Sequence, residues 1–287
     1  MELLQLKYFY ILAQTENITK AAQMLYVAQP SLSQMLKRLE EELGVSLFDR
    51  NGKKISLNGA GKILYRYCEQ ILNALDNAHS ELEEYKGNRI ADINIAVDSA
   101  SLLIPDIVQC IRDNYPKIMP HIFQDYCNDW DIKIYSDSKQ DQHSILLTEE
   151  QIGVVLPKNH PLSEKQILHS KDLNKYGIIN LSPNHSLHKI TNELCESYFF
   201  TPNIVMSVDS PAMLREFVKM NLGIAFIPEI TWKRFINEGL EFRTVADMPM
   251  KRYVQLQLNN KKHLTKAARC CKIVITEYFE EYNRRFR

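Results

Sequence analysis

The chain has 287 residues, of which 45% are hydrophobic and 24% are charged. This length predicts two or three domains, and the composition is typical of a soluble globular protein. No apolar run approaches the ~20 residues that cross a bilayer, and the N-terminus lacks the basic start and long apolar stretch of a signal peptide. We therefore expect a cytoplasmic protein that has no membrane partner.

Net charge and cysteine usage narrow the function classes only a little. Lysines and arginines number 35, as do aspartates and glutamates, so an argument for nucleic acid must rest on local clusters of charge. No GxGxxG, Walker-type glycine loop or HExxH motif is present, and we expect neither a metal nor a cofactor. The cysteines are scattered without a CxxC pair, which favours reduced thiols. They are Cys68, Cys110, Cys127, Cys195, Cys270 and Cys271.

Residues 17–43 predict two short helices joined by a turn. Asn17 or Thr19 can cap the first helix, whose small alanines let a second helix cross close by. The second helix begins at Gln29-Pro30, because proline fits the first helical turn, where its missing N–H costs nothing. Leucines of this helix recur at spacings of 4, 3 and 4, which places them on one buried face. They are Leu32, Leu36, Leu39 and Leu43.

The opposite face of the second helix is polar and suits duplex DNA. Hydroxyl and amide side chains near a helix N-terminus fit base edges in the major groove, and cations fit the flanking phosphates. Further along, Asn51-Gly52 predicts a hairpin turn with basic residues at its tip, as in a wing that touches the DNA backbone. The candidate DNA-contacting residues are Thr19, Gln29, Pro30, Ser31, Ser33, Gln34, Lys37, Arg38, Arg50, Lys53 and Lys54.

A generic helical module whose polar face is merely solvated is the alternative. The run Glu40-Glu41-Glu42 supports it, since three carboxylates would repel a phosphate. These glutamates follow Leu39, however, at the C-terminal end of the helix and away from its reading tip.

The residues of this segment resemble the N-terminal signature of LysR-type transcriptional regulators. The resemblance covers about 60 residues and implies an all-α winged helix-turn-helix at residues 1–58 that binds promoter DNA. Ala28, where the family usually has serine, departs from the signature, as does Asn58, where threonine is common. The matching residues are Leu6, Phe9, Ala21, Ala22, Leu25, Gln29, Pro30, Ser31, Leu32, Ser33, Leu39, Glu40, Leu43, Gly44, Leu47, Phe48, Arg50, Leu57 and Gly61.

Residues 59–88 predict one long linker helix with a seven-residue apolar rhythm. Alternating spacings of 4 and 3 are typical of a coiled-coil seam, and a seam needs a partner, so we expect a homodimer. The alternative is an amphipathic helix that lies on its own domain. The family resemblance also implies dimers, which often pair into homotetramers. The two apolar series are Leu64, Ile71, Ala78 and Tyr85, and Cys68, Leu75 and Leu82.

Residues 89–287 alternate strand-like and helix-like runs, which predicts an α/β fold. Landmarks at 93–101, 115–116, 131–134, 160–162 and 223–228 resemble the regulatory half of LysR-type proteins. The resemblance implies a periplasmic-binding-protein-like, effector-binding domain of two subdomains with a small-molecule cleft between them. We expect subdomain I at 89–160 and 259–287, and subdomain II at 161–258.

Serines at predicted helix starts are the candidates for binding an effector. Free backbone N–H groups and the helix dipole favour an anion there. Ordinary helix N-caps are an equally reasonable interpretation of each residue taken alone. The candidate effector-binding residues are Ser99, Ala100, Ser101, Ser182, His185, Ser210, Gly223 and Ile224.

One segment departs from the resemblance. Residues 117–130 number 14, where the family usually places some two dozen residues, including a helix that lines the cleft. Asp98 also adds a carboxylate at the rim, which would repel organic acids. A regulator that works without a ligand, with an atypical or degenerate effector pocket, therefore stays open as an alternative.

Two further function classes remain. His185, His188, Asn192 and Cys195 could suggest an enzyme, but a metal site or nucleophile there would need a further ligand or base that the local sequence does not supply. A binding protein without DNA activity is disfavoured, because the N-terminal signature is the best-preserved part of the resemblance.

Overall fold

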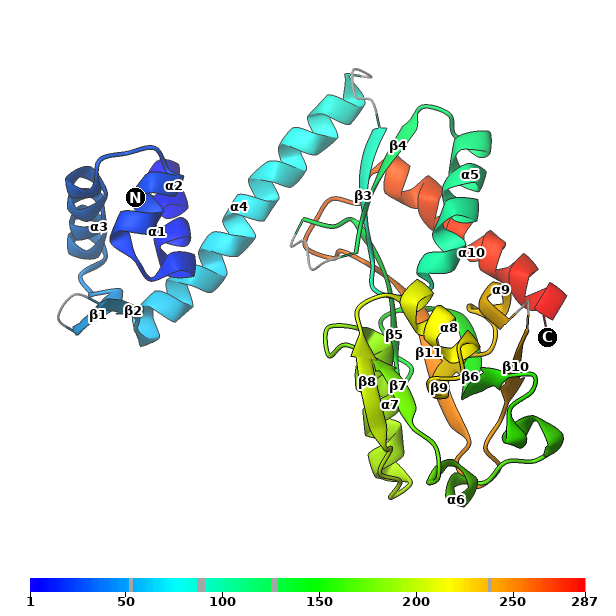
Figure 1. The fold of residues 1–287 in the computed structure, drawn as a ribbon. Coiled ribbons are helices and arrows are strands. Elements are labelled where there is room, and N and C mark those ends of the chain that lie inside the picture. The colour runs from blue at the N-terminus through cyan, green and yellow to red at the C-terminus, as the bar shows by residue number, and fades with distance from the viewer. Residues whose placement is uncertain (52–53, 87–90, 125–128, 237–238, 287) are drawn as a thin grey trace. The chain divides into compact units, whose positions relative to one another are not determined.

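The computed structural model describes residues 1–51, 54–86, 91–124, 129–236 and 239–286. The chain divides into two compact units (Figure 1). The first comprises Met1–Asn88 with Lys261–His263, and the second comprises Arg89–Asn260 with Leu264–Arg287. Within the described residues, no helix combines the length and apolar character needed to cross a bilayer.

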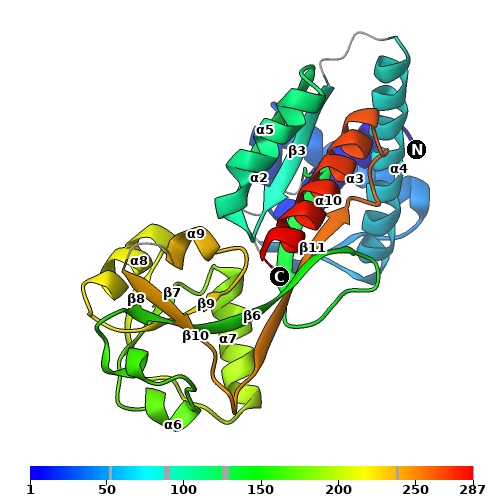
Figure 2. The ribbon, with the colours of Figure 1, turned by 90° about the vertical axis from the view of Figure 1, so that its right-hand side faces the viewer.

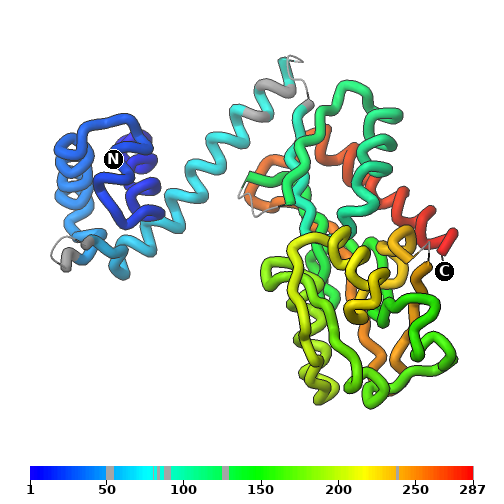
Figure 3. The backbone as a smooth tube through the Cα atoms, viewed as in Figure 1, coloured from blue at the N-terminus to red at the C-terminus, as the bar shows by residue number. Residues whose placement is uncertain are grey.

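The first unit packs three helices against a two-stranded wing and the start of a long helix (Figure 3). Leu32, Leu36 and Leu39 are almost fully buried at its centre, as the leucine spacing predicted, together with Phe9 and Leu12. Leu43 differs from the prediction: it is the last residue of its helix, where the chain leaves the core, and it is 36% exposed. The elements are α1 (Leu3–Thr15), α2 (Ile18–Met24), α3 (Gln29–Leu43), β1 (Phe48–Asn51), β2 (Lys54–Leu57) and α4 (Gly59–Tyr85).

Local signals set the ends of these helices. Asn17 caps α2 by accepting the Lys20 N–H at 3.0 Å, and Asn58 accepts the Gly61 N–H at 2.9 Å at the start of α4. Gly44 ends α3 in the left-handed region at φ 71°. Gly61 permits a close approach, since a Cβ there would lie 2.1 Å from the Leu47 carbonyl oxygen.

The second unit is built on a mixed sheet in the strand order β10-β6-β11-β5-β3-β4, with β9 also pairing with β6. β3 is parallel to β4 and β5, whereas β11 is antiparallel to β5 and β6. The strands are β3 (Ala91–Val97), β4 (Ile118–Phe123), β5 (Ile132–Asp137), β6 (Ile145–Pro157), β7 (Ile178–Leu181), β8 (Ile204–Val208), β9 (Ala225–Pro228), β10 (Leu240–Arg243) and β11 (Met250–Leu258). β7 and β8 form a separate parallel pair.

Helices complete two hydrophobic cores in this unit. α5 and α10 contact each other and cover β3, around one core, while α7, α8 and α9 belong to the part of the unit that encloses the other (Figure 2). The helices are η1 (Ser101–Leu103), α5 (Ile104–Asn114), η2 (Pro161–Glu164), α6 (Ser170–Leu173), α7 (Ser186–Ser197), α8 (Pro211–Lys219), α9 (Lys233–Ile236) and α10 (Lys266–Phe286).

Two strands run from one core into the other. In β6 the buried residues change from one core to the other between Leu147 and Ile152, and in β11 between Met250 and Val254. These changes fall inside the strands, earlier than the subdomain limits at 160 and 258 that the sequence suggested. Paired strands thus connect the subdomains, because each long strand has one end in each core.

The segment before β5 carries no helix in its described residues 117–124 and 129–131. Polar contacts hold the loop against the sheet instead. The Asn94 backbone N–H donates to Asp131 at 2.8 Å, and the Asn94 side-chain amide donates to the Asp129 carbonyl oxygen at 2.8 Å.

Candidate nucleic-acid interface and ligand cavity

The solvent-facing side of α3 presents the polar residues that the sequence singled out. Gln29, Pro30, Ser31, Gln34, Lys37 and Arg38 are exposed, as is Thr19 on α2, while Ser33 is half-buried. The Gln29 amide lies 3.5 Å from the Ser33 hydroxyl, one helical turn along. Gln29, Ser31 and Gln34 are thus accessible in the first two turns of α3, as direct reading of base edges requires.

The three glutamates that favoured a solvated helix each have a partner. Glu40 turns back and accepts the Leu47 N–H at 2.7 Å, which fixes the entry to the wing. Glu41 pairs with Lys37 at 3.6 Å, and Glu42 with the N-terminal amine of Met1. Their charge is therefore partly compensated at the end of α3 that lies away from Gln29.

The wing is an antiparallel hairpin in which Asn51 pairs with Lys54. The sequence placed Arg50 and Lys54 at the tip of the hairpin, whereas Arg50 lies in β1 and Lys54 in β2, next to the turn. Gly52 and Lys53, predicted at the tip, lie outside the described residues.

The predicted seam on α4 is only partly an outer surface. Ile71, Leu75 and Leu82 are exposed, as a surface that a partner covers would be. Cys68 differs from the prediction: it is fully buried in the core of its own unit, and Leu64 packs against that core. The first turns of α4 pack against their own domain, because their apolar side chains cover the core of the winged module.

A cavity of about 590 Å³ lies in the second unit where three helix starts converge. They are the start of η1, which runs directly into α5, and those of α7 and α8. Helix starts carry free N–H groups and a positive partial charge, so together they favour an anionic or polar molecule. The lining residues include Asp98, Ser99, Ala100, Ser101, Gln124, Ser182, His185, Ser186, Asp209, Ser210, Trp232 and Arg252.

The structure brings six of the eight candidate effector residues to this cavity, Ser99, Ala100, Ser101, Ser182, His185 and Ser210. Gly223 and Ile224 do not line it. Ile224 is buried in the hydrophobic core, and a Cβ at Gly223 would lie 2.8 Å from the Gly177 carbonyl oxygen. These two residues let neighbouring chain segments pack closely.

Ser99 is an unusual member of the lining. Its side chain is buried, and its hydroxyl has no hydrogen-bond partner among the described residues. Ser210 by contrast caps α8 by accepting the Ala212 N–H at 3.2 Å. An unpaired buried hydroxyl costs free energy.

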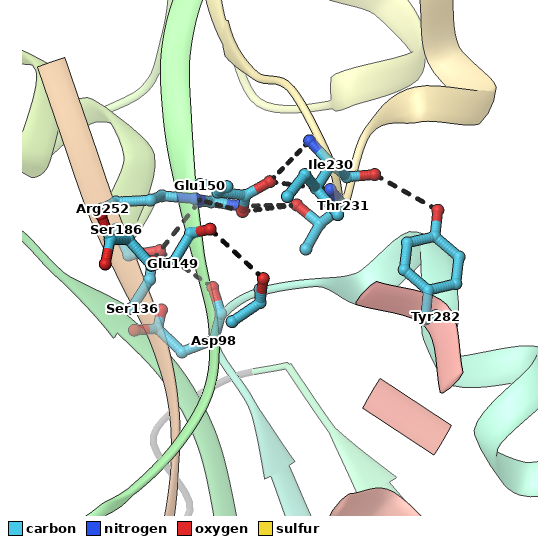
Figure 4. A network of polar contacts seen from close by, with 10 residues as sticks. Asp98, Ser136, Glu149, Glu150, Ser186, Ile230, Thr231, Arg252 and Tyr282 are labelled. Carbon is cyan, nitrogen blue, oxygen red and sulfur yellow. Dashed lines mark hydrogen bonds and ion pairs between the residues drawn. The ribbon is translucent and has the colours of Figure 1, made fainter. Parts of the chain in front are cut away.

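A buried ion pair lies behind the cavity (Figure 4). Arg252 donates from Nε to Glu150 Oε1 at 2.9 Å, and both side chains are almost fully buried. Glu150 also accepts the backbone N–H groups of Ile230 and Thr231 at 2.9 and 2.7 Å. The Tyr282 hydroxyl of α10 donates to the Ile230 carbonyl oxygen at 3.2 Å. The network therefore joins the cavity wall to the loop after β9 and to α10.

Asp98 is held beside this network. The Ser186 hydroxyl donates to the Asp98 carbonyl oxygen at 3.0 Å. Burial raises the pKa of the Asp98 carboxyl group, although the positive charges of Lys133 and Lys189 act in the opposite direction. The carboxylate is therefore costly to keep charged at neutral pH.

Of the residues that could have suggested an enzyme, His185 lines the cavity, whereas the other three make contacts within the fold. The His188 ring nitrogens contact the Leu181 carbonyl oxygen at 2.7 Å and the Asn192 amide at 2.9 Å. Cys195 is buried, and burial raises its thiol pKa to about 11, far from a reactive thiolate. Among the described residues, no group of three or more histidine, cysteine or acidic side chains could hold a metal ion.

Family models decide the classification of the chain. Residues 3–62 match the bacterial regulatory helix-turn-helix protein, lysR family, and residues 92–280 match the LysR substrate binding domain. The chain belongs to the LysR family of transcriptional regulators. Membership confirms the winged helix-turn-helix and the α/β regulatory domain, and it shows that this chain regulates transcription and is not an enzyme.

Relatives and solved structures agree with this membership. The LysR-family chain is 28% identical over 243 residues to the HTH-type transcriptional regulator YybE of Bacillus subtilis, covering 80% of this chain and 83% of the relative. It is 26% identical over 285 residues to a protein of Thalassiosira pseudonana described as a Probable RuBisCO transcriptional regulator, covering 92% and 93%. A full-length OxyR variant of Pseudomonas aeruginosa shares the fold, with a TM-score of 0.64, 21% identity and coverage of 96% and 94%.

The candidate effector residues of this LysR-family regulator omitted several residues that line the cavity, Arg252, Trp232 and Gln124 among them. Arg252, Trp232 and Gln124 lie in or beside segments that carried no motif. A charge next to the apolar pattern of β11 was the one available signal for Arg252, since a buried strand rarely holds an arginine without a partner.

Proposed function

We propose that this LysR-family regulator reads promoter DNA with the exposed start of α3 and the wing, and that a small anionic or polar molecule in the cavity controls it. The unpaired hydroxyl of Ser99, buried where three helix starts meet, is the observation that carries the effector proposal. The regulator would act in the cytoplasm, with residues 1–58 as the DNA-binding domain and 89–287 as the regulatory domain.

The surface of α3 supports the DNA proposal. Gln29, Ser31 and Gln34 offer exposed donors and acceptors to base edges, while Lys37 and Arg38 offer cations to phosphates. Ser33 contributes a hydroxyl beside Gln29. Arg50, Lys53 and Lys54 of the wing complete the proposed contact with the backbone.

The exposed apolar stripe on α4 supports a homodimer. Ile63 and Tyr67 extend the series of Ile71, Leu75 and Leu82, and all five side chains are more than one-third exposed in the single chain. Large apolar side chains in a row on one helix indicate a surface that a second copy covers. Pairing of dimers into homotetramers is part of the same proposal.

A regulator without a ligand is the second candidate. Two observations favour it: the described part of 117–131 contributes no helix to the cavity wall, and Asp98 places a carboxylate among the lining residues. Partner contacts would then replace the effector. The distinction depends on whether a small molecule binds at Ser99.

Calorimetry of the full-length protein against a panel of metabolites tests the effector proposal. Because small-molecule sites usually bury ~70–90% of their ligand, an incompletely walled cavity predicts weak binding, at roughly −5 kcal/mol. The double variant Ser99→Ala/Ser101→Ala should weaken binding of any hit. A sub-micromolar hit that binds this variant equally well would show that the pocket has been misplaced.

A further inference from the structure

The turn between α2 and α3 carries an aromatic residue with an unusual backbone. Tyr26 has φ 54°, in the left-handed region, and its side chain is 96% exposed. The residues on either side, Leu25 and Val27, pack against the core of the unit. The chain is therefore anchored on both sides of Tyr26, and only this side chain projects into solvent.

Among the described residues, the Tyr26 side chain makes no hydrogen bond or ring contact that would stabilise the fold. Left-handed backbone is unfavourable for a residue with a Cβ, and glycine or asparagine would occupy it at lower cost. The backbone itself makes the turn, because the Tyr26 N–H donates to the Gln23 carbonyl oxygen at 3.2 Å and the Val27 N–H to that of Ala22 at 3.0 Å. The ring is not needed for either bond. The Tyr26 backbone is strained and its side chain does not pack against the fold, which indicates that the residue has a role other than stability.

The surroundings of Tyr26 suit the backbone of duplex DNA. Ala28 gives the start of α3 no side-chain hydrogen bond, so the positive end of this 15-residue helix stays open two residues after Tyr26. Lys20 on α2 and Arg38 on α3 add exposed cations to the same module. A phenol hydroxyl can donate to a phosphate oxygen, and its ring can lie against a sugar.

We propose that Tyr26 is a DNA-backbone contact of this regulator, in which its hydroxyl donates to a phosphate beside the groove that α3 enters. The inference rests on the proposed function, since it needs α3 to face DNA. A contact of this kind positions the protein on the duplex and is blind to base sequence. Because the contact does not depend on base sequence, its effect can be measured on any duplex and no operator is required.

The chain supplies a matched control in Phe199. This residue ends α7 with φ 54° and is 98% exposed, in the same helix-ending turn, but it has no hydroxyl and lies in the other unit. Its presence shows that the turn alone does not identify a DNA contact. Phe199→Gly should therefore relieve the same backbone strain without changing DNA binding.

The test measures binding of full-length variants to a labelled duplex of random sequence by fluorescence anisotropy over a range of salt. Tyr26→Phe removes one hydrogen bond to a charged group and should weaken binding roughly tenfold. Tyr26→Gly should weaken binding at least as much while melting at or above the wild-type temperature, because glycine relieves the strained φ. Neither change should alter the salt slope, since a neutral phenol releases no counterion.

Arg38→Ala distinguishes a failure of the Tyr26 contact from a failure of the whole α3 interface. This variant should weaken binding and lower the salt slope by roughly 1. If Arg38→Ala does so while both Tyr26 variants bind as wild type, the Tyr26 contact is wrong and the DNA proposal stands. If Arg38→Ala and the Tyr26 variants all bind as wild type, the proposed α3 interface itself is wrong. An equal loss in Phe199→Gly and Tyr26→Gly would also overturn the Tyr26 contact, because the effect would not be local.

Discussion

Glu150 and Arg252 stand directly opposite each other on β6 and β11 and form an ion pair 2.9 Å long. Their side chains are 0% and 2% exposed, so neither charge has water to replace a lost partner. The pair lies in the stretch of both strands where one hydrophobic core gives way to the other. The Glu150–Arg252 pair therefore contributes to holding the two subdomains together.

Glu150→Gln should destabilise the regulatory domain strongly. The substitution leaves the Arg252 charge buried without a counter-charge, which costs about 3 kcal/mol and should lower Tm by roughly 6–12 °C. Differential scanning calorimetry measures the change. Replacing both partners, as in Glu150→Leu with Arg252→Met, removes the unpaired charge but leaves the buried N–H groups of Ile230 and Thr231 without an acceptor, so it should recover only part of the loss.

The same two strands provide the control for this prediction. Lys251 and Glu149 form a 2.6 Å pair whose side chains are 49% and 37% exposed. Lys251→Gln should leave Tm almost unchanged, because water screens and replaces the interaction. Equal losses for Glu150→Gln and Lys251→Gln would show that burial does not govern the Glu150–Arg252 pair.

Ser99→Ala should raise the stability of the free protein. The hydroxyl of Ser99 is buried without a partner, so its removal relieves a desolvation cost of about 1 kcal/mol. Ser186→Ala, on the opposite wall, removes a 3.0 Å hydrogen bond to Asp98 and should lower stability by ~1 kcal/mol. Chemical unfolding of both variants gives the comparison, and a clear loss of stability in Ser99→Ala would mean that the serine has a partner in solution.

Asp98→Asn should stabilise the protein at pH 7 and much less near pH 4. Burial raises the Asp98 carboxyl pKa, so the folded state holds this proton more tightly than the unfolded state does. The resulting stability is complete below about pH 4, the unfolded value, and is lost as the pH rises through the folded pKa. Melting temperatures of both proteins between pH 4 and 8 check the sign, and a gain that grows toward low pH contradicts it.

Ile71→Glu should reduce the dimer mass measured by light scattering. Ile71 is 39% exposed in the single chain and belongs to the apolar stripe of α4. A carboxylate at this place would lose water on association, which is costly unless a cation pairs with it. Asp76→Lys, five residues further along and on another side of the helix, should leave the mass unchanged. If Ile71→Glu also leaves the mass unchanged, this stripe is not the interface.

Gln29→Ala and Lys53→Ala should affect DNA binding in different ways. Loss of the Gln29 amide should relax sequence preference, because an amide at the exposed start of α3 reads base edges. Loss of the Lys53 cation should weaken all duplexes similarly and lower the salt slope by roughly 1. Affinity for operator and random duplexes at several salt concentrations separates the effects, and equal losses on both duplexes for both variants would refute this division of labour.

Local patterns in the sequence were enough to predict the winged module and the alternation of strands and helices in the regulatory domain. The leucine spacing of α3, the proline at its start and the asparagine caps of α2 and α4 act within one or two helical turns. Such features are readable because the residues that interact are close in the sequence.

Which residues these elements bring together depends on the three-dimensional packing. It buried Cys68 in its own domain, placed Gly223 in the packing of strands, and gathered Ser99, His185 and Ser210 around one cavity. The pairing of Glu150 with Arg252 joins residues 102 positions apart. No local pattern encodes that contact, because it depends on the register of two long strands, which the packing of two separate cores fixes.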